Sequence, residues 1–471
     1  MPVSPSPTFD LSAQHQFRQQ LVAGLTQARN QGCLFLSISR DLPPIDPLLA
    51  LAGLSDCGMD PQADYFYLEQ PGTGMAIAAL GALRTYTAEG CQRFQDVRHF
   101  CQTTFAQIFC LDGGHPRIFC HFTFHDRPTG HQGTSASRAI LPQWQIHQRD
   151  QQVQLTLNCD VLLEPGEIDR LCGQWQRIWE HLQTLPPTFD IESVMVPTIS
   201  LPNLTVQHQG FVRGVHTALK VLQTGEMEKL VLACAADITA PRPFSWEATL
   251  QNLRHHYPNC YLFSVRCDGG STFVGASPER LVSLEQGVLT ADALAGSSPR
   301  GGDRHQDQAL TTALYHSEKD RHEHQVIVQF LSHTLKNLGL LIPPPGEPQV
   351  LKLANIQHLQ TLIRATPHPA VHLLDILAAL HPTPAVAGYP RAIAYEWMRQ
   401  LETFERGMYA APLGWVDCNG EGEFIVGIRS ALLQGTMARL YAGAGIVRGS
   451  DPEREWQEVL LKLQALVSAI A

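Results

Sequence analysis

The sequence contains no CxxC pair, although its 471 residues include 12 cysteines. These cysteines are scattered singly, and a chain of this length can stabilise its core without disulfides, so we expect them to be reduced core residues. The sequence also has 21 histidines but no HExxH pattern. In the run His322-Glu323-His324, adjacent side chains would point in different directions on a helix. This argues against a zinc site.

Long apolar runs and an excess of basic residues are absent as well. No uninterrupted apolar segment approaches the roughly 18 residues of a membrane-spanning helix, and residues 1–21 lack the apolar core of a secretion signal. The 34 Lys and Arg residues against 44 Asp and Glu residues give a net charge of -10. Nucleic acid and anionic membranes are therefore not expected as partners, and a soluble, cytoplasmic protein is predicted.

The chain does contain enough apolar residues for a large core, at 44% of the sequence. At roughly 150 residues per domain, a chain of this length would have about three domains. Large mixed α/β enzymes, however, often fold as one body whose parts cannot be separated. Periodicity predicts helices near 10–30 and 167–185, with strands between them. The segment 185–204 has four prolines and no helical period, which is typical of a connector. We divide the chain into 1–204 and 205–471 and expect strands of both parts to share sheets.

The most informative segment of the chain covers residues 423–462. Alternation predicts one strand with Phe424, Val426 and Ile428 on one face and Arg429 on the other. A turn at Gln434-Gly435 returns the chain into a second strand. This strand ends in a run of alternating alanine and glycine, which lets a ligand approach the backbone closely.

A helix with a strong N-terminal signal, Ser450-Asp451-Pro452, follows this strand. Its apolar stripe is predicted to face the core and contains Trp456, Val459, Leu460, Leu463, Leu466 and Val467. Beside that stripe, Glu455, Glu458 and Lys462 line up along the helix. They form either a solvated face with an ordinary ion pair or a stripe that faces a ligand, which the preceding glycines favour.

Three other charged residues are candidates for chemistry. Lys229 begins an apolar strand, where it is either exposed at the first position, the simpler interpretation, or desolvated; desolvation lowers the pKa of a lysine and makes it a candidate base. Glu279, between Pro278 and a strand, either occupies a pocket or caps a turn. Glu323 extends the core stripe of a helix predicted over 309–338, which its sequence allows to break early, and a buried carboxylate needs a partner. A metal ion would supply that partner, and oxygen ligands favour Mg²⁺ over zinc.

Turn signals mark the segment that leads to this helix. A hairpin is predicted to turn at Gln286-Gly287. The polar stretch from Ser298 to Gln308, with Gly301 and Gly302, predicts a mobile surface loop.

Nine segments of the chain resemble, in order and spacing, the chorismate-utilising enzymes and most closely their isochorismate synthase branch. They are KLVLAC, GASPERL, ALAGS, KDRHEH, IQHL, LHPTPAVAGYP, GMYAAPLGW, EFIVGIRSA and AGAGIVRGSDPEREWQE, and the match covers about residues 211–467. One segment alone, such as Gly443-x-Gly445, would be weak, and a Rossmann interpretation of that pair lacks the first strand and the downstream acid. Nine collinear segments make chance agreement implausible.

The resemblance implies an α+β fold with large antiparallel β-sheets packed in a layered sandwich, helices outside and the active site in a cleft. It also implies a Mg²⁺-dependent, reversible isomerisation of chorismate to isochorismate, in which water adds at C2 and the C4 hydroxyl departs. Lys229 would be the general base for the water and Glu279 the general acid for the leaving hydroxyl. Such a pair needs a base and an acid on opposite ring faces.

Binding roles follow from the same resemblance. Glu323 and Glu458 would hold Mg²⁺, with Glu455 nearby. The residues expected to receive or border the substrate are Tyr409, Arg429, Gly443 and Lys462, with Gly296, Ser297 and His358 as further cleft residues. Because chorismate is a dianion, cations and a metal are the expected receivers of its carboxylates.

Two details choose among branches of the family. Lysine at position 229 resembles the water-using branch, since ammonia-using anthranilate and aminodeoxychorismate synthases typically carry glutamine there, and Ala295 lacks the lysine of the latter. No glutamine amidotransferase subunit is therefore expected. The LHPTPAVAGYP loop favours isochorismate synthases over salicylate synthases, which share base, acid and metal and add a pyruvate elimination. Menaquinone or phylloquinone formation is the expected use of the product, with siderophore or salicylate supply as the alternative.

The chain also departs from the family pattern at two positions. Cys234 stands where an arginine often ends the first motif, which could alter the surroundings of the cleft. Ser297 stands for a usual threonine and keeps the hydroxyl. A non-catalytic chorismate-binding protein is the remaining alternative, but decay would first erase the charged residues, and all of these are present: Lys229, Glu279, Glu323, Glu458 and Arg429.

Overall fold

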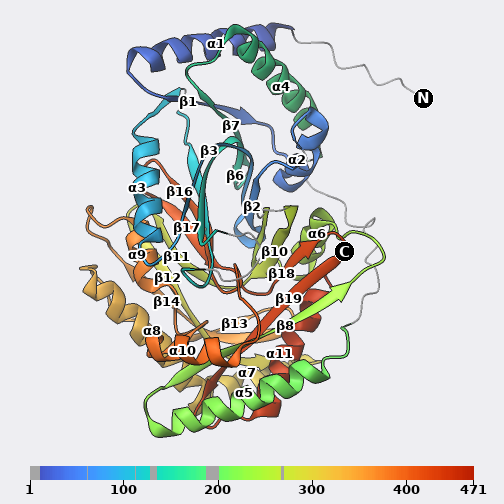
Figure 1. The fold of residues 1–471 in the computed structure, drawn as a ribbon, viewed down its shortest axis with the longest axis vertical. Coiled ribbons are helices and arrows are strands. Elements are labelled where there is room, and N and C mark those ends of the chain that lie inside the picture. Colours follow the sequence, from blue (N-terminus) through green and yellow to red (C-terminus); the bar gives the residue numbers. More distant parts are fainter. Residues whose placement is uncertain are drawn as a thin grey trace.

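The computed structural model describes residues 11–60, 62–111, 113–127, 135–186, 201–266 and 270–470. Most of the connector predicted at 185–204 lies outside these ranges. Within them, helices surround one branched sheet (Figure 1). The helices are α1 (Leu11–Asn30), α2 (Pro47–Gly53), α3 (Arg93–Phe105), α4 (Pro165–Thr184), α5 (Thr205–Thr224), α6 (Trp246–His256), α7 (Arg304–His316), α8 (Glu318–Asn337), α9 (Leu373–Leu380), α10 (Arg391–Leu401) and α11 (Pro452–Val467).

The strands of the described residues belong to one hydrogen-bonded network. They are β1 (Phe35–Leu42), β2 (Tyr65–Gln70), β3 (Met75–Ala88), β4 (Ile108–Leu111), β5 (Arg117–Phe122), β6 (Ser137–Arg149), β7 (Gln152–Asp160), β8 (Lys229–Thr239), β9 (Tyr261–Arg266), β10 (Thr272–Ser277), β11 (Arg280–Glu285), β12 (Val288–Pro299), β13 (Gln349–Lys352), β14 (Ile356–Ala365), β15 (Gly388–Tyr389), β16 (Pro412–Asp417), β17 (Gly422–Val426), β18 (Ser430–Gln434) and β19 (Met437–Val447).

The network forks at β6. This strand pairs with β3 along its length, with β5 through its first residues and with β7 through its last. From β3, one arm continues through β2, β9, β10, β18 and β19 to β8. From β5, a second arm continues through β16, β17, β11 and β12 to β14. All of these pairings are antiparallel.

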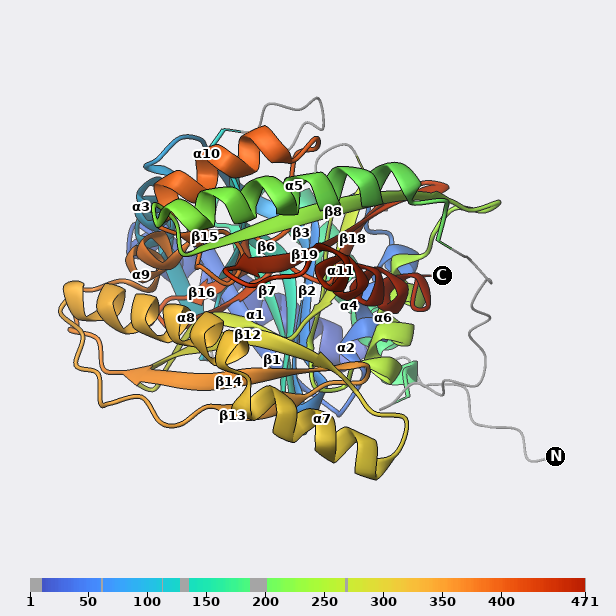
Figure 2. The same cartoon turned by 90° about the horizontal axis from the view of Figure 1, so that it is seen from below.

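The far ends of the two arms face each other. In the view from below, β8 and β19 form one layer and β12 and β14 form another, with α5 outside the first layer and α7 beyond the second (Figure 2). The predicted α+β architecture, with antiparallel sheets in layers and helices outside, is thereby confirmed. No helix in the described ranges combines the length and apolar character needed to cross a membrane.

The part of the chain before residue 204 holds the base of the fork. Residues 66–69 of β2 pair with residues 262–265 of β9, and β5 pairs with β16. An ion pair of 2.6 Å between the largely buried side chains of Arg254 and Asp46 adds a side-chain link between the two parts. Each arm is therefore built on a strand from the N-terminal part.

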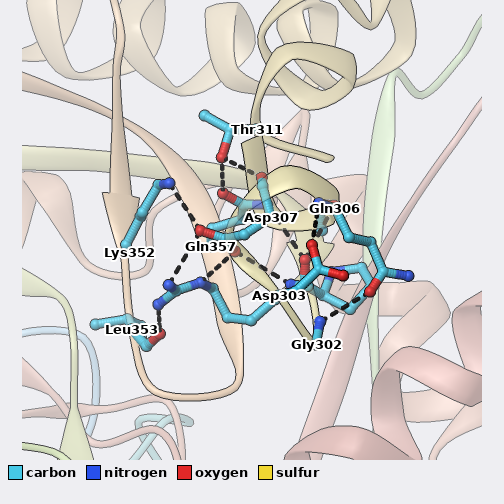
Figure 3. Close-up of polar contacts among 12 residues, drawn as sticks. Gly302, Asp303, Gln306, Asp307, Thr311, Lys352, Leu353 and Gln357 are labelled. Atoms are coloured by element: carbon cyan, nitrogen blue, oxygen red, sulfur yellow. Dashed lines mark hydrogen bonds and ion pairs between the residues drawn. The ribbon is translucent and has the colours of Figure 1, made fainter. Parts of the chain in front are cut away.

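The segment predicted as a mobile loop, Ser298 to Gln308, is mostly ordered secondary structure. β12 extends to Pro299 and α7 begins at Arg304. Between them Arg300 donates to both carboxylate oxygens of Asp307, at 2.6 and 3.1 Å, and Lys352 donates to the same carboxylate at 2.8 Å. Figure 3 shows Asp307 and Lys352 of this cluster, with Thr311 of α7 and Gln357 of β14 beside them. The loop prediction is wrong because these polar side chains bind one another rather than water.

Residues 423–434 form two strands instead of the single strand predicted. β17 ends at Val426 and β18 begins at Ser430, because Arg429 takes the left-handed backbone region with φ of 49°. β17 pairs with β11 in the second arm, whereas β18 pairs with β10 in the first. The break lets the chain cross between the arms and places Arg429 at the crossing.

The long helix predicted over 309–338 is divided into α7 and α8. Ser317 ends α7 and caps α8, since its Oγ accepts a hydrogen bond from the backbone N–H of Asp320 at 3.2 Å. The break changes the direction of the chain just before Glu323.

Candidate active site

One pocket lies where the two arms of the sheet face each other. β8 and β19 contribute to one side and β12 and β14 to the other, and α8 and α11 add charged side chains. All predicted site residues except Glu455 line it: Lys229, Glu279, Gly296, Ser297, Glu323, His358, Tyr409, Arg429, Gly443, Glu458 and Lys462. Positions spread over more than 230 residues of sequence are thus brought around a single space.

Lys229 is the first residue of β8, and its side chain is buried, with the residue 0% exposed. Its Nζ lies 2.7 Å from Oε1 of Glu323 in α8, but the geometry is not that of a hydrogen bond, so Nζ has no hydrogen-bond partner among the described residues. The simpler interpretation, an exposed strand position, is wrong because β15 pairs with the start of β8 and places Tyr389 opposite Lys229.

Glu279 follows β10 and is also buried. Burial raises the pKa of its carboxyl group to about 8, the charge of Asp292 adds to the rise, and Lys229 opposes it. The backbone is fixed on both sides, since Ser277 Oγ accepts from the N–H of Glu279 and Val426 donates to its carbonyl. Oε1 has no hydrogen-bond partner among the described residues. A carboxyl group that keeps its proton at neutral pH therefore borders the pocket.

The glycines of β19 make room for side chains of the site. A Cβ at Gly445 would overlap Oε1 of Glu323 and lie 2.9 Å from Cε of Lys229. A Cβ at Gly443 would lie 2.9 Å from the carbonyl of Leu232 and 3.1 Å from the hydroxyl of Tyr409. The close approach expected at this glycine run is thus made by the protein's own charged and polar groups.

Gly445→Ala is therefore expected to lower the free energy of unfolding by about 1–3 kcal/mol, because the added methyl group overpacks a filled site. Urea unfolding measures the change. Gly210→Ala is the matched control, since nothing lies within 4 Å of a Cβ at that position in α5; there the substitution should stabilise by about 0.5–1 kcal/mol. Equal stability of Gly445→Ala and the parent protein would contradict the tight packing described above.

The three charged residues aligned on α11 take part in two separate ion pairs. Lys462 donates to Oε1 of Glu458 at 2.7 Å and to the carbonyl of Gly443 at 2.8 Å. Burial alone would raise the pKa of Glu458, but Lys462 outweighs it and the net pKa lies below the ordinary value. Glu455 is 3% exposed, which excludes a solvated face; it pairs with Lys319 at 2.7 Å, and the two residues line a neighbouring pocket.

The carboxylates of Glu323 and Glu458 in the pocket fit a magnesium ion whose coordination is completed by a ligand. No group of three His, Cys, Asp or Glu side chains in the described ranges is placed to hold a metal alone. Glu323 and Glu458 nevertheless border the same pocket, and both raise the pKa of Asp320 after the larger effect of its burial. Mg²⁺ commonly uses one or two carboxylates and completes its coordination with water and substrate oxygens. The donor set suits that arrangement and does not form an all-protein cage.

Arg429 has a cationic hydrogen-bond donor that is not used by the described residues. Its Nη2 donates to Nε2 of His358 at 2.7 Å, while Nη1 has no hydrogen-bond partner among the described residues. Burial holds the pKa of His358 well below its ordinary value, with Arg429 and Lys462 adding to the effect. The histidine is thus neutral and accepts from the guanidinium, which leaves Nη1 for an anion in the pocket.

Comparison with known proteins identifies the family to which these residues belong. The family model described as chorismate binding enzyme matches residues 19–471 of the chain. The chain belongs to the chorismate-binding enzymes.

Relatives of this chorismate-binding enzyme match between about half and nearly all of its length. "Salicylate biosynthesis isochorismate synthase" of Pseudomonas aeruginosa is 34% identical over 461 residues, which are 95% of this chain and 92% of the relative. "Isochorismate synthase MenF" of Escherichia coli is 37% identical over 270 residues, 56% of this chain and 62% of the relative. A solved structure of the menaquinone-specific MenF of Escherichia coli has a TM-score of 0.72 at 27% identity, covering 96% of this chain and 100% of that one. These matches confirm the predicted family and enzyme class: the named relatives are isochorismate synthases, which are isomerases.

Several pocket or neighbouring residues of this chorismate-binding enzyme were not singled out from the sequence. Leu294, Ala385, Val386 and Tyr441 line the pocket, and Lys319 supports Glu455 from outside it. Ala385 and Val386 fall in the LHPTPAVAGYP segment and Lys319 in KDRHEH, so the motifs contained a signal for them. Leu294 likewise falls in ALAGS, whereas Tyr441 lies outside the nine segments and carried no signal, because strand alternation does not say which apolar face borders a pocket.

The unusual Cys234 does not border the pocket of this chorismate-binding enzyme. It is buried in β8, where burial and then Glu402 raise the pKa of its thiol to about 12. Glu402 forms a buried ion pair with Arg406. Arg406 also donates hydrogen bonds to the carbonyls of Val231 and Val386. An altered cleft is therefore not visible at this position.

Proposed function

We propose that this chorismate-binding enzyme is an isochorismate synthase, which converts chorismate reversibly to isochorismate. The observation that carries the proposal is a pair of buried groups that border one pocket: Nζ of Lys229, which is ion-paired with Glu323, and Oε1 of Glu279, which has no hydrogen-bond partner among the described residues. Glu279 holds a proton near neutral pH, and Lys229 lies on another element bordering the same pocket. An isomerisation by water addition and hydroxyl loss needs such an acid and such a base.

The proposed steps use residues of this chain. Lys229 takes a proton from the water that adds at C2 of chorismate. Glu279 gives its proton to the C4 hydroxyl, which leaves as water. One water enters and one leaves, so substrate and product have the same composition.

The remaining residues of the pocket bind and orient the substrate. Nη1 of Arg429 and the hydroxyl of Tyr409 are donors for one carboxylate, with the backbone at Gly443 beside them, and Lys462 lies close to a substrate carboxylate. Glu323 and Glu458 would hold Mg²⁺, with Glu455 nearby; the ion would neutralise the ring carboxylate and fix its orientation. All residues with a proposed role lie in 205–471, and we propose that 1–204 supports the sheet on which they stand.

The product is proposed to enter menaquinone or phylloquinone formation, and the relative named for salicylate biosynthesis supports the alternative use. Because water rather than ammonia is the nucleophile, the enzyme is proposed to act without a glutamine amidotransferase subunit. Disrupting the gene and measuring quinones and salicylate in the cells would separate the two uses.

The activity is tested by incubating the purified protein with chorismate and Mg²⁺ and separating the products by chromatography. Isochorismate alone, lost when EDTA removes the metal and restored by added Mg²⁺, is the expected result. Salicylate with pyruvate would assign the protein to the salicylate synthases instead. Unchanged chorismate would contradict the proposal and favour a binding protein.

A further inference from the structure

The edge of β8 that faces β15 changes its partner after two residues. β15 pairs with residues 229–230 of this edge, and the backbone N–H of Val231 donates to the carbonyl of Ala387 at 2.8 Å. β19 pairs along the whole of the opposite edge. No strand in the described ranges continues the pairing on the first edge, so the carbonyl of Val231 and the N–H of Ala233 need other partners there.

One buried ion pair supplies both of these partners. Nη2 of Arg406 donates to the carbonyl of Val231 at 3.0 Å, and Oε1 of Glu402 accepts from the N–H of Ala233 at 2.9 Å. Arg406 also donates to both carboxylate oxygens of Glu402, through Nε at 2.9 Å and through Nη2 at 2.5 Å. The pair therefore offers β8 a donor and an acceptor side by side, as a neighbouring strand would.

The same guanidinium holds a second segment that borders the pocket. Its Nη1 donates to the carbonyl of Val386, between α9 and β15, at 2.7 Å. Val231 and Val386 both line the pocket, whereas Glu402 and Arg406 do not. Arg406 thus contacts the pocket wall from behind, through the backbone.

Aromatic rings complete the surroundings of the guanidinium. Its Cζ lies 4.4 Å from the ring centre of Phe124 and 5.8 Å from that of Tyr409. The N–H of Tyr409 donates to the carbonyl of Arg406 at 2.8 Å. Burial strengthens contacts between a cation and an aromatic ring, and Arg406 is 1% exposed. Arg406 therefore also helps to fix Tyr409, a proposed substrate ligand.

The ion pair is itself anchored on two sides. Glu402 is the residue that ends α10, which packs against β8 (Figure 2), and its N–H donates to the carbonyl of Met398 at 2.8 Å. Gly407, next to Arg406, accepts from the N–H of Phe124 at 2.7 Å. The side chains of the pair are thus held between a helix and the N-terminal part of the chain.

We propose that Arg406 and Glu402 are positioning residues, which take the place of a neighbouring strand at the edge of β8 and so hold Lys229 and Tyr409 around the substrate. The identity of that substrate rests on the proposed function. Altering the pair should loosen this edge of β8. It should also lower catalysis in protein that is still folded, whereas a pair that only stabilises the fold would change the Tm alone.

Arg406→Lys tests the role in catalysis. The lysine keeps the charge and can still pair with Glu402, but one ammonium nitrogen cannot replace three guanidinium nitrogens. We expect kcat/KM for chorismate to fall about 10- to 100-fold, with kcat lowered and KM raised, because a small displacement of groups around a substrate slows the reaction. Steady-state kinetics well below the Tm of each variant measure the change.

Glu402→Gln tests the other half of the pair. The amide oxygen can still accept from Ala233, but the guanidinium loses its anion. The loss of kcat/KM should be at least as large as in Arg406→Lys. If one of the two variants does not fold, the other is held to the same expectation, and parent values of kcat and KM in a folded variant would overturn the proposal.

Arg254→Lys is the matched control. Arg254 forms a largely buried, two-bonded ion pair with Asp46, at 2.6 and 3.0 Å, and neither residue lines the pocket. This variant should have a lower Tm than the parent, as Arg406→Lys should, but the kcat and KM of the parent. An equal fall of kcat/KM in Arg254→Lys would show that loss of stability explains the result and would overturn the positioning role.

Hydrogen–deuterium exchange, followed by mass spectrometry, measures the edge of β8 without any assay of turnover. Peptides covering 229–235 and 384–390 should exchange about 10-fold faster in Arg406→Lys, as expected for the loss of one supporting hydrogen bond, and at the parent rate in Arg254→Lys. Faster exchange in a protein that makes no isochorismate would remove the proposed function and leave the structural role of the pair standing. Unchanged exchange in a protein that makes isochorismate would keep the function and overturn the role of the pair.

Discussion

Replacing Lys229 with glutamine is expected to lower kcat for chorismate isomerisation by about 10²- to 10⁴-fold, the usual contribution of a general base. Nζ of Lys229 is buried, borders the pocket and has no hydrogen-bond partner among the described residues. Glutamine keeps a neutral hydrogen-bonding group near Glu323 but cannot take a proton from water. Steady-state kinetics with excess chorismate and Mg²⁺ measure the loss, and Lys229→Ala should be at least as inactive.

The loss should affect turnover and not substrate binding. Calorimetry with Lys229→Gln is therefore expected to show Mg²⁺-dependent chorismate binding close to that of the parent protein. Lys220→Gln, at an exposed position of α5, is the matched control and should keep full activity. An active Lys229→Gln enzyme would exclude Lys229 as the base.

Glu279→Gln is expected to reduce kcat by about 10²- to 10⁴-fold, because the amide cannot give a proton to the departing hydroxyl. The parent enzyme should also lose activity as the pH rises through about 8. The pKa of the Glu279 carboxyl group is raised to about 8 in the folded protein. The group is therefore protonated and able to act as the acid below that pH, and ionised above it. A pH profile of kcat/KM, which reports ionisations of the free enzyme, measures this descending limb.

The residual activity of Glu279→Gln should lack that limb. Glu226→Gln, an exposed carboxylate just before β8, should retain both activity and pH profile. A descending limb near pH 8 that persists in Glu279→Gln would assign the ionisation to another group.

Burial of Glu279 also predicts how stability depends on pH. The pKa of Glu279 is higher in the folded protein than in the unfolded chain. As the pH rises from about 4.5 to about 8, Glu279 therefore ionises in the unfolded chain but stays protonated in the folded protein. This difference lowers the free energy of unfolding. Glu279→Gln lacks this titration. The Tm of the variant relative to the parent should therefore increase between pH 5 and pH 8.

The sequence by itself determined the family, the order of most elements and the residue types of the pocket. Apolar periodicity predicted α11, and the turn at Gln286-Gly287 is where β11 returns into β12, because these features depend on neighbours in the chain. The charged residues of the motifs were found because chemistry of this kind needs them.

Only the tertiary structure decided how those residues are used. Burial of Lys229 depends on β15, whose pairing residue Tyr389 is 160 positions away, and the break at Arg429 depends on two arms that must be joined there. The polar segment after β12 is ordered because Asp307 forms ion pairs with both Arg300 and Lys352, which come from different elements. Such long-range partners set burial, protonation and hydrogen-bond direction, and local sequence pattern contains no information about which distant group will arrive.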